Sequence, residues 1–286
     1  MLEISGHTKQ LGIIGYPIEH TFSPRMHNFI SEKISNDYVY SAWCVHPDNL
    51  KEAMEGIRAL GIAGVNVTAP HKIDVMKYID VVSEQAKLLG SVNTVVNRGG
   101  RLYGYNTDSE GFYTALKKAG IVVENSRILI FGAGGVVKPT IIRLTQANPK
   151  SITVVNRTKE KVLGLAKAIK DTTGFEIETE VREKRFDIVI NTTSAGMAPQ
   201  LDKLPIDAIN EFDDLSFIDE NTSAVDMIYN PAETLFLKEA KKYGAKIAIN
   251  GLGMLIYQGI IAYELFTDTK LLDDMGDIIK EEVFNR

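Results

Sequence analysis

The sequence has a single cysteine, little net charge and no long apolar run, and each of these absences excludes a class of protein. Cys44 alone allows neither an internal disulfide nor a multi-cysteine metal site, and the apolar run over 38–45 predicts a buried structural thiol. A net charge of -5 at pH 7 argues against broad binding to nucleic acid or anionic membranes. No window approaches a membrane span, and the N-terminus has no basic region followed by an apolar one. We therefore expect a cytoplasmic protein that binds neither nucleic acid nor membrane.

What the chain does have is enough apolar sequence for two domains or for one large α/β domain. It has 286 residues, of which 44% are hydrophobic, and this is about twice the length of a usual domain. His20, His27 and His71 are candidate metal ligands by number alone, because no pair has H-x-x-x-H spacing and no carboxylate pattern accompanies them. We expect no metal.

Two series of alternating strands and helices run along the chain. The first comprises strand 11–15, a helix from about Ser23, strand 38–45, helix 48–60, strand 64–67, helical segments near 71–89 and a hairpin over 91–106. A helix from Asp108 to Gly120 connects it to the second series, whose strands lie within 127–135, 151–158, 186–196, 223–231 and 245–251. Short apolar strands separated by helices predict an α/β fold with a parallel sheet covered on both faces.

A glycine-rich turn follows the first strand of the second series. In the segment RILIFGAGGVVKP, Gly132, Ala133, Gly134 and Gly135 come directly after the strand and open a helix, where backbone N–H groups can approach a pyrophosphate. The match to G-x-G-x-x-G is partial, because Val137 occupies the third glycine position. Glycine turns after strands often serve packing alone, so this motif does not decide the ligand.

The end of the next strand favours NADP over NAD. An NAD-binding protein usually has an acid there, about 20 residues after the glycines, to bond the ribose 2′-hydroxyl. This chain instead has Asn156, Arg157 and Thr158. A guanidinium can bond two oxygens of a 2′-phosphate, and Thr158 can cap the following helix. The alternative is a solvated arginine. Further on, Thr192, Thr193 and Ser194 end a later strand and either line a cofactor crevice or cap a turn.

Polar side chains also follow the strands of the first series. Ser23 precedes Pro24 as an N-cap would, which leaves the second hydroxyl, Thr21, without an explanation. Asn66, Thr68 and Lys72 lie in the segment NVTAPHK after strand 64–67. Lysines of this kind are usually surface charges.

Three further polar residues lie in apolar surroundings. Asn93 belongs to GSVNTVV, Asp108 begins the connector helix, and Gln258 interrupts the apolar helix that starts at Leu252. Each has a structural explanation, as a turn asparagine, a capping aspartate or a glutamine bonded to backbone. A polyhydroxylated ligand would equally supply the partners that such groups need.

Together these segments resemble the shikimate dehydrogenase family over nearly the whole chain. The segments that carry the resemblance occur in the family's order: GYPIEHTFSPRMHN, GVNVTAPHK, GSVNTVV, GYNTDSEGF, FGAGGV, VNRT, NTTSAGM, DMIYNP and MLIYQG. The resemblance implies reduction of 3-dehydroshikimate to shikimate with NADPH, in the pathway to chorismate and the aromatic amino acids. It also implies a monomer or homodimer.

The resemblance further implies a fold and a set of site residues. The fold is an N-terminal αβα substrate domain (1–107 with 252–286) and a Rossmann-type NADP-binding domain (108–251), with the active site in the cleft between them. Lys72 and Asp108 would form the catalytic pair. The substrate would contact Thr21 and Ser23 through its carboxylate and Asn66, Thr68, Asn93 and Gln258 through its ring hydroxyls. The cofactor would contact Gly132, Ala133, Gly134, Gly135, Asn156, Arg157, Thr158, Thr192, Ser194, Met227 and Gly251.

Two departures from the family pattern bear on these expectations. Thr21 stands where the family commonly has serine, and Val137, Lys138 and Pro139 replace the small residues that often follow the glycines. Two other functions stay open at this point. One is a quinate/shikimate dehydrogenase with broader substrate and cofactor use, and the other is a non-catalytic NADP-binding regulator.

Overall fold

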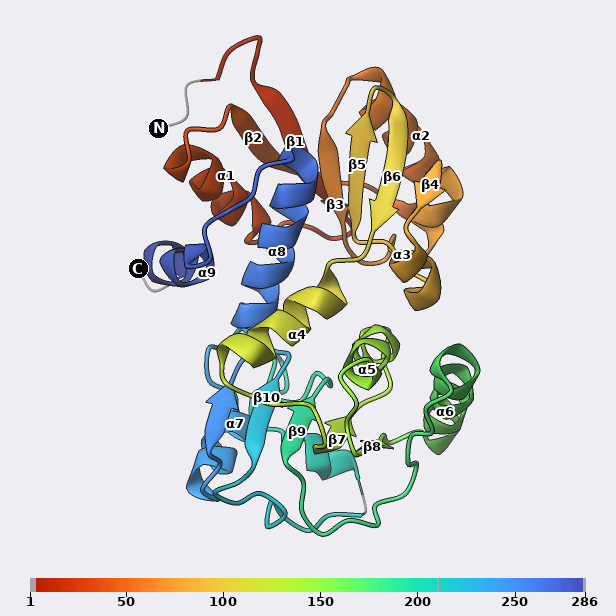
Figure 1. Cartoon of the computed structure of the whole chain (residues 1–286), viewed down its shortest axis with the longest axis vertical. Coiled ribbons are helices and arrows are strands. Elements are labelled where there is room, and N and C mark those ends of the chain that lie inside the picture. The colour runs from red at the N-terminus through yellow and green to blue at the C-terminus, as the bar shows by residue number, and fades with distance from the viewer. Residues whose placement is uncertain (1–3, 210, 285–286) are drawn as a thin grey trace. The chain divides into compact units, whose positions relative to one another are not determined.

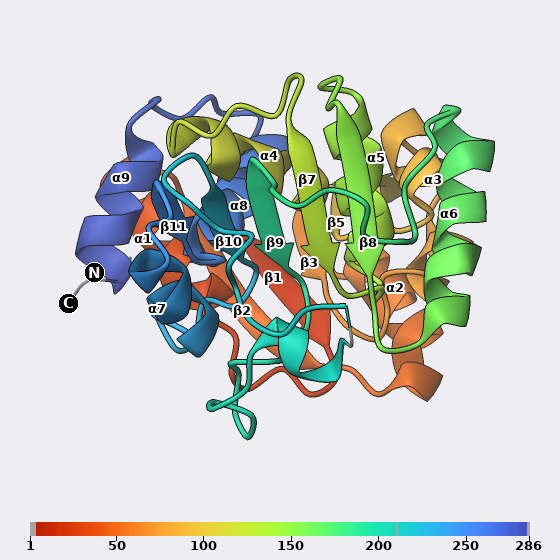
Figure 2. The same cartoon turned by 90° about the horizontal axis from the view of Figure 1, so that it is seen from below.

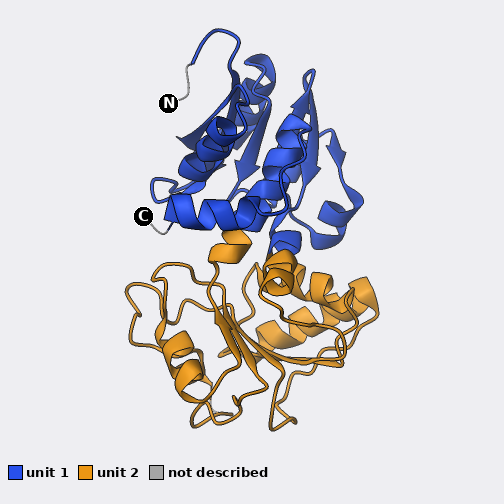
Figure 3. Cartoon of the chain, turned by 60° about the vertical axis from the view of Figure 1, so that its left-hand side comes forward, with its two compact units in different colours: residues 1–111, 256–286 blue, residues 112–255 orange. Residues whose placement is uncertain are grey.

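The computed structural model describes residues 4–209 and 211–284, and the chain divides into two compact units. Unit 1 comprises residues 1–111 and 256–286, and unit 2 comprises residues 112–255 (Figure 3). The chain passes between the units within helix α4 (Asp108–Lys118) and within helix α8 (Leu252–Thr267).

Unit 1 is built on a mixed six-stranded sheet in the order β2-β1-β3-β5-β6-β4. Strand β1 runs parallel to both β2 and β3, whereas β5 is antiparallel to β3 and to β6. The β5–β6 hairpin turns through Gly99 and Gly100, whose φ angles of +62° and +86° glycine adopts without strain (Figure 1). The strands are β1 (Lys9–Gly15), β2 (Tyr38–Cys44), β3 (Gly64–Val67), β4 (Val81–Val82), β5 (Thr94–Arg98) and β6 (Arg101–Tyr105).

Helices cover both faces of this sheet. Phe266 of α8 lies against Gly64 of β3, while Met54 of α2 packs in a core cluster with the next strand residue, Val65. Successive residues of a strand face opposite sides, so α8 and α2 cover opposite faces. The helices of this unit, besides its share of α4 and α8, are α1 (Ser23–Lys33), α2 (Leu50–Ala59), α3 (Glu84–Leu89) and α9 (Met275–Ile279), with short turns at Pro47–Asn49, Asp74–Tyr78 and Lys280–Phe284.

Unit 2 has a parallel five-stranded sheet in the order β11-β10-β9-β7-β8 (Figure 2). Counted along the chain this is the order 5-4-3-1-2, a doubly wound arrangement whose switch point lies between β7 and β9. The strands are β7 (Arg127–Phe131), β8 (Ser151–Val155), β9 (Ile188–Asn191), β10 (Ser223–Asp226) and β11 (Ile247–Ile249). The helices are α5 (Val137–Thr145), α6 (Lys159–Thr173) and α7 (Leu235–Lys242), with a short turn at Pro205–Ala208.

The apolar runs of unit 2 are buried on both faces, as the sequence predicts. Leu129 and Phe131 lie in one core cluster with Phe236 of α7. Ile128 and Ile130 point to the other face and are also fully buried. The predicted α/β fold is therefore confirmed. No helix in the described parts of the chain is long and apolar enough to cross a membrane.

One sequence expectation about burial is wrong. Cys44 is exposed, although the apolar run around it predicts a buried thiol. Strand β2 is an edge strand, and only Tyr38 and Tyr40 in it are buried. Cys44 is its last residue and points to the same side of the sheet as these tyrosines, but burial ends before it is reached.

Histidine His27 of α1 is completely buried in unit 1. Its ring stacks on that of Tyr40, with 4.2 Å between centroids and 4° between planes, and also lies near Tyr263. Among the described residues neither ring nitrogen has a hydrogen-bond partner. Burial lowers the pKa of His27 from 6.5 to about 3, because the protonated ring loses its hydration there.

This burial predicts a pH-dependent stability. Below pH 6.5 the unfolded chain protonates His27 while the folded chain does not until about pH 3, so the free energy of unfolding falls as pH decreases through this window. The contribution is about 1.4 kcal/mol per pH unit. We expect wild type to lose about 2 kcal/mol more than His27→Phe between about pH 7.5 and about pH 5 in urea unfolding. His7→Gln, at an exposed position, serves as the control. Equal losses in wild type and His27→Phe would contradict the assignment.

Candidate functional site

The topology of unit 1 brings four chain segments to one edge of its sheet. The loop after β1 and the loop after β3 meet there because these strands are parallel. The amino end of β5 and the carboxyl end of β6 reach the same edge because β5 is antiparallel to both β3 and β6. The predicted substrate and catalytic residues of unit 1, apart from Gln258, lie on these segments.

Lys72 and Asp108 form an ion pair at this edge. Lys72 Nζ lies 2.7 Å from Asp108 Oδ2, across 36 residues of sequence. The pair is partly accessible, with side-chain exposures of 35% for the lysine and 18% for the aspartate. The backbone carbonyl of Lys72 accepts a bond from Val92 N, which ties its loop to the segment leading into β5. The lysine is therefore held at the site and is not a freely solvated surface charge.

Asp108 is the first residue of α4, and its side chain bonds other side chains instead of capping the helix. Oδ2 accepts from Lys72, and Oδ1 accepts from Asn93 Nδ2 at 2.8 Å. The capping explanation for this aspartate is thus replaced by a contact with two polar side chains.

Asn93 is nearly buried and fully hydrogen-bonded. Its Nδ2 donates to Thr107 Oγ1 and to Asp108 Oδ1, and its Oδ1 accepts from the Thr107 backbone N–H and from Thr94 Oγ1. Asn93 therefore orients the aspartate of the ion pair. A ligand hydroxyl at this position would replace one of these bonds.

Asn66, at the centre of β3, has a similarly complete set of partners. Its Oδ1 accepts from the Tyr40 hydroxyl at 2.7 Å, and its Nδ2 donates to Asn93 O and to Thr94 Oγ1. Thr68, two residues on, is half-buried, and its backbone bonds hold the turn that leads to Lys72.

Thr21 and Ser23 lie together at the start of α1, but the capping role considered for Ser23 is not found. Phe22 is the N-cap residue and Ser23 is already the first residue of the helix, without a side-chain cap bond. Thr21 Oγ1 donates to Ser23 Oγ at 3.2 Å and accepts from Ser23 N at 3.3 Å. Burial raises the pKa of the Tyr40 hydroxyl, while the nearby Ser23 side chain lowers it.

Gln258 of α8 reaches the beginning of α4. A side chain on Gly111 would come within 2.5 Å of Gln258 N and 2.6 Å of its Cβ, so the two helices cross closely at that glycine. Gly111 lies one helical turn after Asp108, which places the half-buried Gln258 near the ion pair's helix.

In unit 2 a pocket of about 490 Å³ opens at the carboxyl ends of β7, β8 and β9. This edge includes the switch point of the sheet, where ligands of doubly wound folds bind. Four of the predicted cofactor residues line it, namely Gly132, Asn156, Arg157 and Ser194, whereas Ala133, Gly134, Gly135, Thr158, Thr192, Met227 and Gly251 do not. Gly132 has φ +112°, and a Cβ there would overlap Thr192 Oγ1, so only glycine fits.

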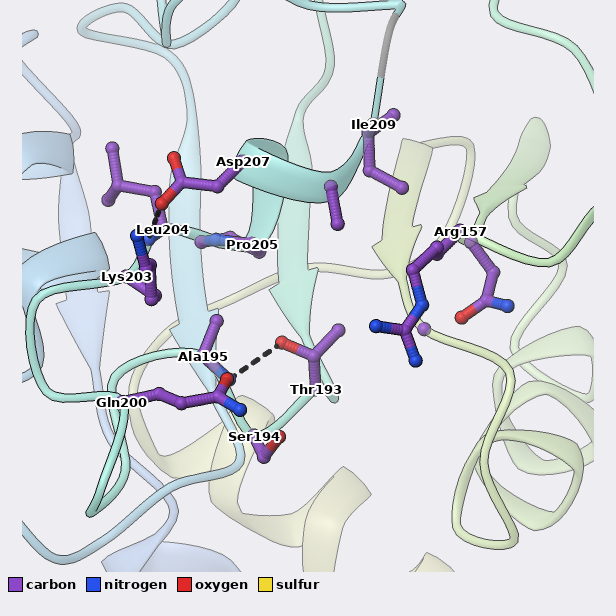
Figure 4. Close-up of a pocket in the computed structure, with 13 residues that line it drawn as sticks. Arg157, Thr193, Ser194, Ala195, Gln200, Lys203, Leu204, Pro205, Asp207 and Ile209 are labelled. Carbon is purple, nitrogen blue, oxygen red and sulfur yellow. Dashed lines mark hydrogen bonds between the residues drawn. The ribbon is translucent and has the colours of Figure 1, made fainter.

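Figure 4 shows the side chains around this pocket, with Arg157 on one side and Lys203 on the other. Arg157 is exposed and forms no ion pair with any residue that the structure describes. An accessible, unpaired guanidinium at a strand's carboxyl end is available to an anionic ligand.

The hydroxyls after β9 divide into two kinds. Thr192 Oγ1 donates to Phe131 O at 2.6 Å and so joins the ends of β9 and β7. Thr193 Oγ1 donates to Asn191 Oδ1 at 2.7 Å and also lines the pocket. Thr158 precedes α6 as its N-cap residue, but the capping bond expected from its side chain is absent. Asn156 Nδ2 donates to Thr158 O instead.

Met227 and Gly251 lie side by side after β10 and β11. A Cβ on Gly251 would overlap the Met227 carbonyl, and Gly251 N donates to Ile228 O. The buried Asp226 holds this region by accepting from Thr234 Oγ1 at 2.7 Å and from Ile228 N at 2.9 Å. Burial raises the pKa of Asp226.

The unusual residues after the glycines begin helix α5 without disturbing it. Val137 is fully buried as the first residue, and Pro139 lies in the first turn, where a backbone N–H has no partner within the helix. The valine at position 137, where the family often has a small residue, is therefore explained by its packing in the core of unit 2.

Sequence reasoning missed several residues of both sites. Tyr40, Thr94 and Thr107 carry hydroxyls that bond Asn66 and Asn93. In sequence Tyr40 and Thr94 look like ordinary strand residues, and Thr107 looks like a linker residue before the connector helix. In unit 2 the pocket wall over 203–209 was missed, because no motif marks it. Within the described residues no group of three or more His, Cys, Asp or Glu is placed to hold a metal.

Sequence models of known families match three parts of the chain. Residues 13–95 match the shikimate dehydrogenase substrate binding domain. Residues 114–211 match shikimate / quinate 5-dehydrogenase, and residues 251–271 match the shikimate 5'-dehydrogenase C-terminal domain.

Individual relatives agree with these matches. The shikimate dehydrogenase (NADP(+)) of Methanococcus maripaludis strain C6 is 42% identical over 274 residues, which cover 93% of this chain and 94% of the relative. A solved shikimate dehydrogenase in complex with NADP+ has a TM-score of 0.88 at 40% identity, with 98% of each chain covered. The Thermus thermophilus enzyme, solved in complex with NADP(H) and shikimate, has a TM-score of 0.83 at 30% identity, with 96% of this chain and 99% of that chain covered.

Proposed function

The chain belongs to the shikimate dehydrogenase family, and we propose that it reduces 3-dehydroshikimate to shikimate with NADPH, using Lys72 and Asp108 as its proton-transfer pair. The relatives are NADP-dependent oxidoreductases. The observation that carries the residue assignment is the 2.7 Å contact between Lys72 Nζ and Asp108 Oδ2. It brings together the two groups that a carbonyl reduction needs, a cationic donor and an anion that orients it.

The hydrogen bonds around the pair favour Lys72 as the group that gives up the proton. Both oxygens of Asp108 are engaged, by Lys72 and by Asn93, so the aspartate serves to hold the lysine in place. An ammonium has three N–H donors, and only one of them is used by Asp108. A donor on Lys72 Nζ can therefore polarise the ketone oxygen and transfer a proton to it as negative charge develops.

The hydroxyl and amide groups at the same sheet edge suit a polyhydroxylated acid. We propose that Thr21 and Ser23 bind the substrate carboxylate, since hydroxyls donate and a carboxylate accepts. Asn66, Thr68, Asn93 and Gln258 would contact ring hydroxyls. Thr21 keeps the hydroxyl of the serine that the family commonly has, and its extra methyl group adds bulk at this position.

The pocket of unit 2 fits NADP. Its unpaired Arg157 suits a 2′-phosphate, and Gly132 leaves room for a backbone approach to the pyrophosphate. Ala133, Gly134, Gly135, Asn156, Thr158, Thr192, Ser194, Met227 and Gly251 complete the proposed cofactor set. NADPH, when bound, supplies the hydride that reduces the ketone.

An absorbance assay at 340 nm tests this function. The purified chain is offered shikimate or quinate, each with NADP+ or NAD+, and the reverse reaction is followed with 3-dehydroshikimate and NADPH. We expect the highest kcat/KM with shikimate and NADP+. Comparable rates with quinate or with NAD+ would point to the broader enzyme, and no turnover in any combination would overturn the proposal.

A further inference from the structure

A continuous chain of hydrogen bonds runs from the Tyr40 hydroxyl through Asn66, Thr94 and Asn93 to the Lys72–Asp108 pair. We infer that Tyr40 is a positioning residue, whose hydroxyl fixes the orientation of Asn66 and, through Thr94 and Asn93, that of the Asp108 carboxylate. The inference rests on the proposed function, because it assigns Tyr40 a part in the same reaction.

The side-chain amide of Asn93 determines which atoms donate and which accept along this chain of hydrogen bonds. The backbone N–H of Thr107 can only donate, and it lies 2.8 Å from Asn93 Oδ1. The amide nitrogen of Asn93 therefore faces the other way, 2.8 Å from Asp108 Oδ1, which as a carboxylate oxygen accepts it. The orientation of Asp108 thus depends on the orientation of this one amide.

Thr94 passes the same constraint to Asn66. Thr94 Oγ1 donates its single hydroxyl proton to Asn93 Oδ1, which lies 2.9 Å away. Its oxygen must then accept, and Asn66 Nδ2 donates to it at 3.1 Å and to the Asn93 backbone carbonyl at 3.2 Å. The Asn66 Oδ1 atom is left facing Tyr40.

Tyr40 completes the chain by donating to that oxygen at 2.7 Å. Tyr40 is 2% exposed, and burial raises the pKa of its hydroxyl well above the usual value, which keeps the proton available for donation. The neighbouring Ser23 hydroxyl accepts from Thr21 Oγ1 at 3.2 Å, so its own proton is not used in that contact.

This arrangement separates substrate binding from the orientation of the catalytic pair. A carboxylate arriving at Thr21 and Ser23 would accept the Ser23 proton, which the chain from Tyr40 to Asp108 does not use. The Tyr40 proton would stay on Asn66 in either case, so Asn66, Thr94 and Asn93 keep their directions. Without the Tyr40 hydroxyl, Asn66 Oδ1 would be a buried acceptor without a donor. This would destabilise the present orientation of the Asn66 side-chain amide and favour its rotation by 180°.

The other function of Tyr40 is packing, and a substitution can separate the two. Its ring stacks on His27 within the core. Tyr40→Phe keeps the ring and removes only the hydroxyl. Tyr38→Phe is the matched control, since Tyr38 points to the same face of β2 and is 8% exposed, and its hydroxyl bonds only weakly, at 3.5 Å, to Lys9 Nζ.

We expect Tyr40→Phe and Thr94→Val each to lower kcat by about tenfold, the equivalent of one lost hydrogen bond at the reacting pair. The KM for NADPH should stay within about twofold of wild type, since neither residue belongs to the proposed cofactor set. The Tyr40→Phe/Thr94→Val double variant should lose no more kcat than the more impaired of the two single variants, because either change already breaks the chain. Tyr38→Phe should retain the wild-type kcat. Equal kcat values for Tyr40→Phe and Tyr38→Phe, or fully additive losses in the double variant, would overturn the inference.

A second readout does not depend on the reaction. In ¹⁵N-labelled full-length protein, the side-chain amide resonances of Asn93 should shift in Tyr40→Phe and stay in place in Tyr38→Phe. If wild type fails to turn over shikimate, the proposed function falls, and the Asn93 resonances still decide whether Tyr40 positions this amide. Unchanged Asn93 resonances in Tyr40→Phe would overturn the chain even in an active enzyme.

Discussion

Replacing Lys72 by alanine is expected to lower kcat by about 10²–10⁴-fold while the protein stays folded, which is the usual size of a general acid–base contribution. The substitution removes the N–H donors that face the ketone oxygen and leaves Asp108 with Asn93 as its remaining side-chain partner. Since Lys72 is 35% exposed, its loss creates no large cavity, and the unfolding transition should stay close to that of wild type. Steady-state rates with shikimate and NADP+ and a thermal melt measure the two effects.

Lys77→Ala provides the matched control for this prediction. Lys77 lies five residues further along the chain and forms an ion pair with Asp74, but its side chain is 68% exposed. Its replacement should leave kcat unchanged. A Lys72→Ala enzyme with nearly normal turnover would remove the lysine from the mechanism.

Replacing Arg157 by alanine is expected to weaken NADPH binding by roughly tenfold to a hundredfold and to leave NADH binding almost unchanged. A hydrogen bond to a charged group contributes about 1.5–3 kcal/mol, and only NADPH has the 2′-phosphate that would accept it. Arg157 has no ion-pair partner among the described residues, so its loss should not destabilise unit 2. Dissociation constants for both dinucleotides, from the quenching or enhancement of nicotinamide fluorescence, give the comparison.

Arg182→Ala is the corresponding control, because Arg182 is 77% exposed and lies outside the pocket lining. It should leave both affinities as they are in wild type. Equal losses of NADPH and NADH affinity in Arg157→Ala would refute the assignment of this arginine to the 2′-phosphate.

Much of the architecture follows from local pattern. The segment GVNV predicts a strand at 64–67, where β3 lies, and the two-glycine hairpin signal predicts the turn at Gly99 and Gly100. Apolar runs such as the ILIF of β7 predict the parallel sheet of unit 2, since such runs are typical of strands that are covered on both faces. The error at Cys44 has the same origin, because an apolar run does not show at which residue burial along a strand ends.

Local sequence pattern predicts less of the candidate site than of the fold. Lys72 and Asp108 are 36 residues apart, and nothing local predicts their contact; the family resemblance supplied the pairing. The hydroxyls of Tyr40 and Thr94 were missed because tyrosine and threonine are common strand residues, so their types carry no signal of function. Which atom donates in a hydrogen bond depends on neighbours in three dimensions. For Asn93 the deciding neighbour is the Thr107 backbone N–H, which lies opposite Oδ1.

The central claim, that Lys72 delivers a proton during NADPH-dependent ketone reduction, is tested most directly by single-turnover kinetics. Enzyme saturated with NADPH is mixed with 3-dehydroshikimate, and the loss of absorbance at 340 nm is followed for wild type, Lys72→Ala and Asp108→Asn. The account predicts a rapid loss in wild type and a rate constant lower by about 10²–10⁴-fold in Lys72→Ala, with NADPH affinity unchanged. A Lys72→Ala enzyme that oxidises bound NADPH at the wild-type rate would contradict it.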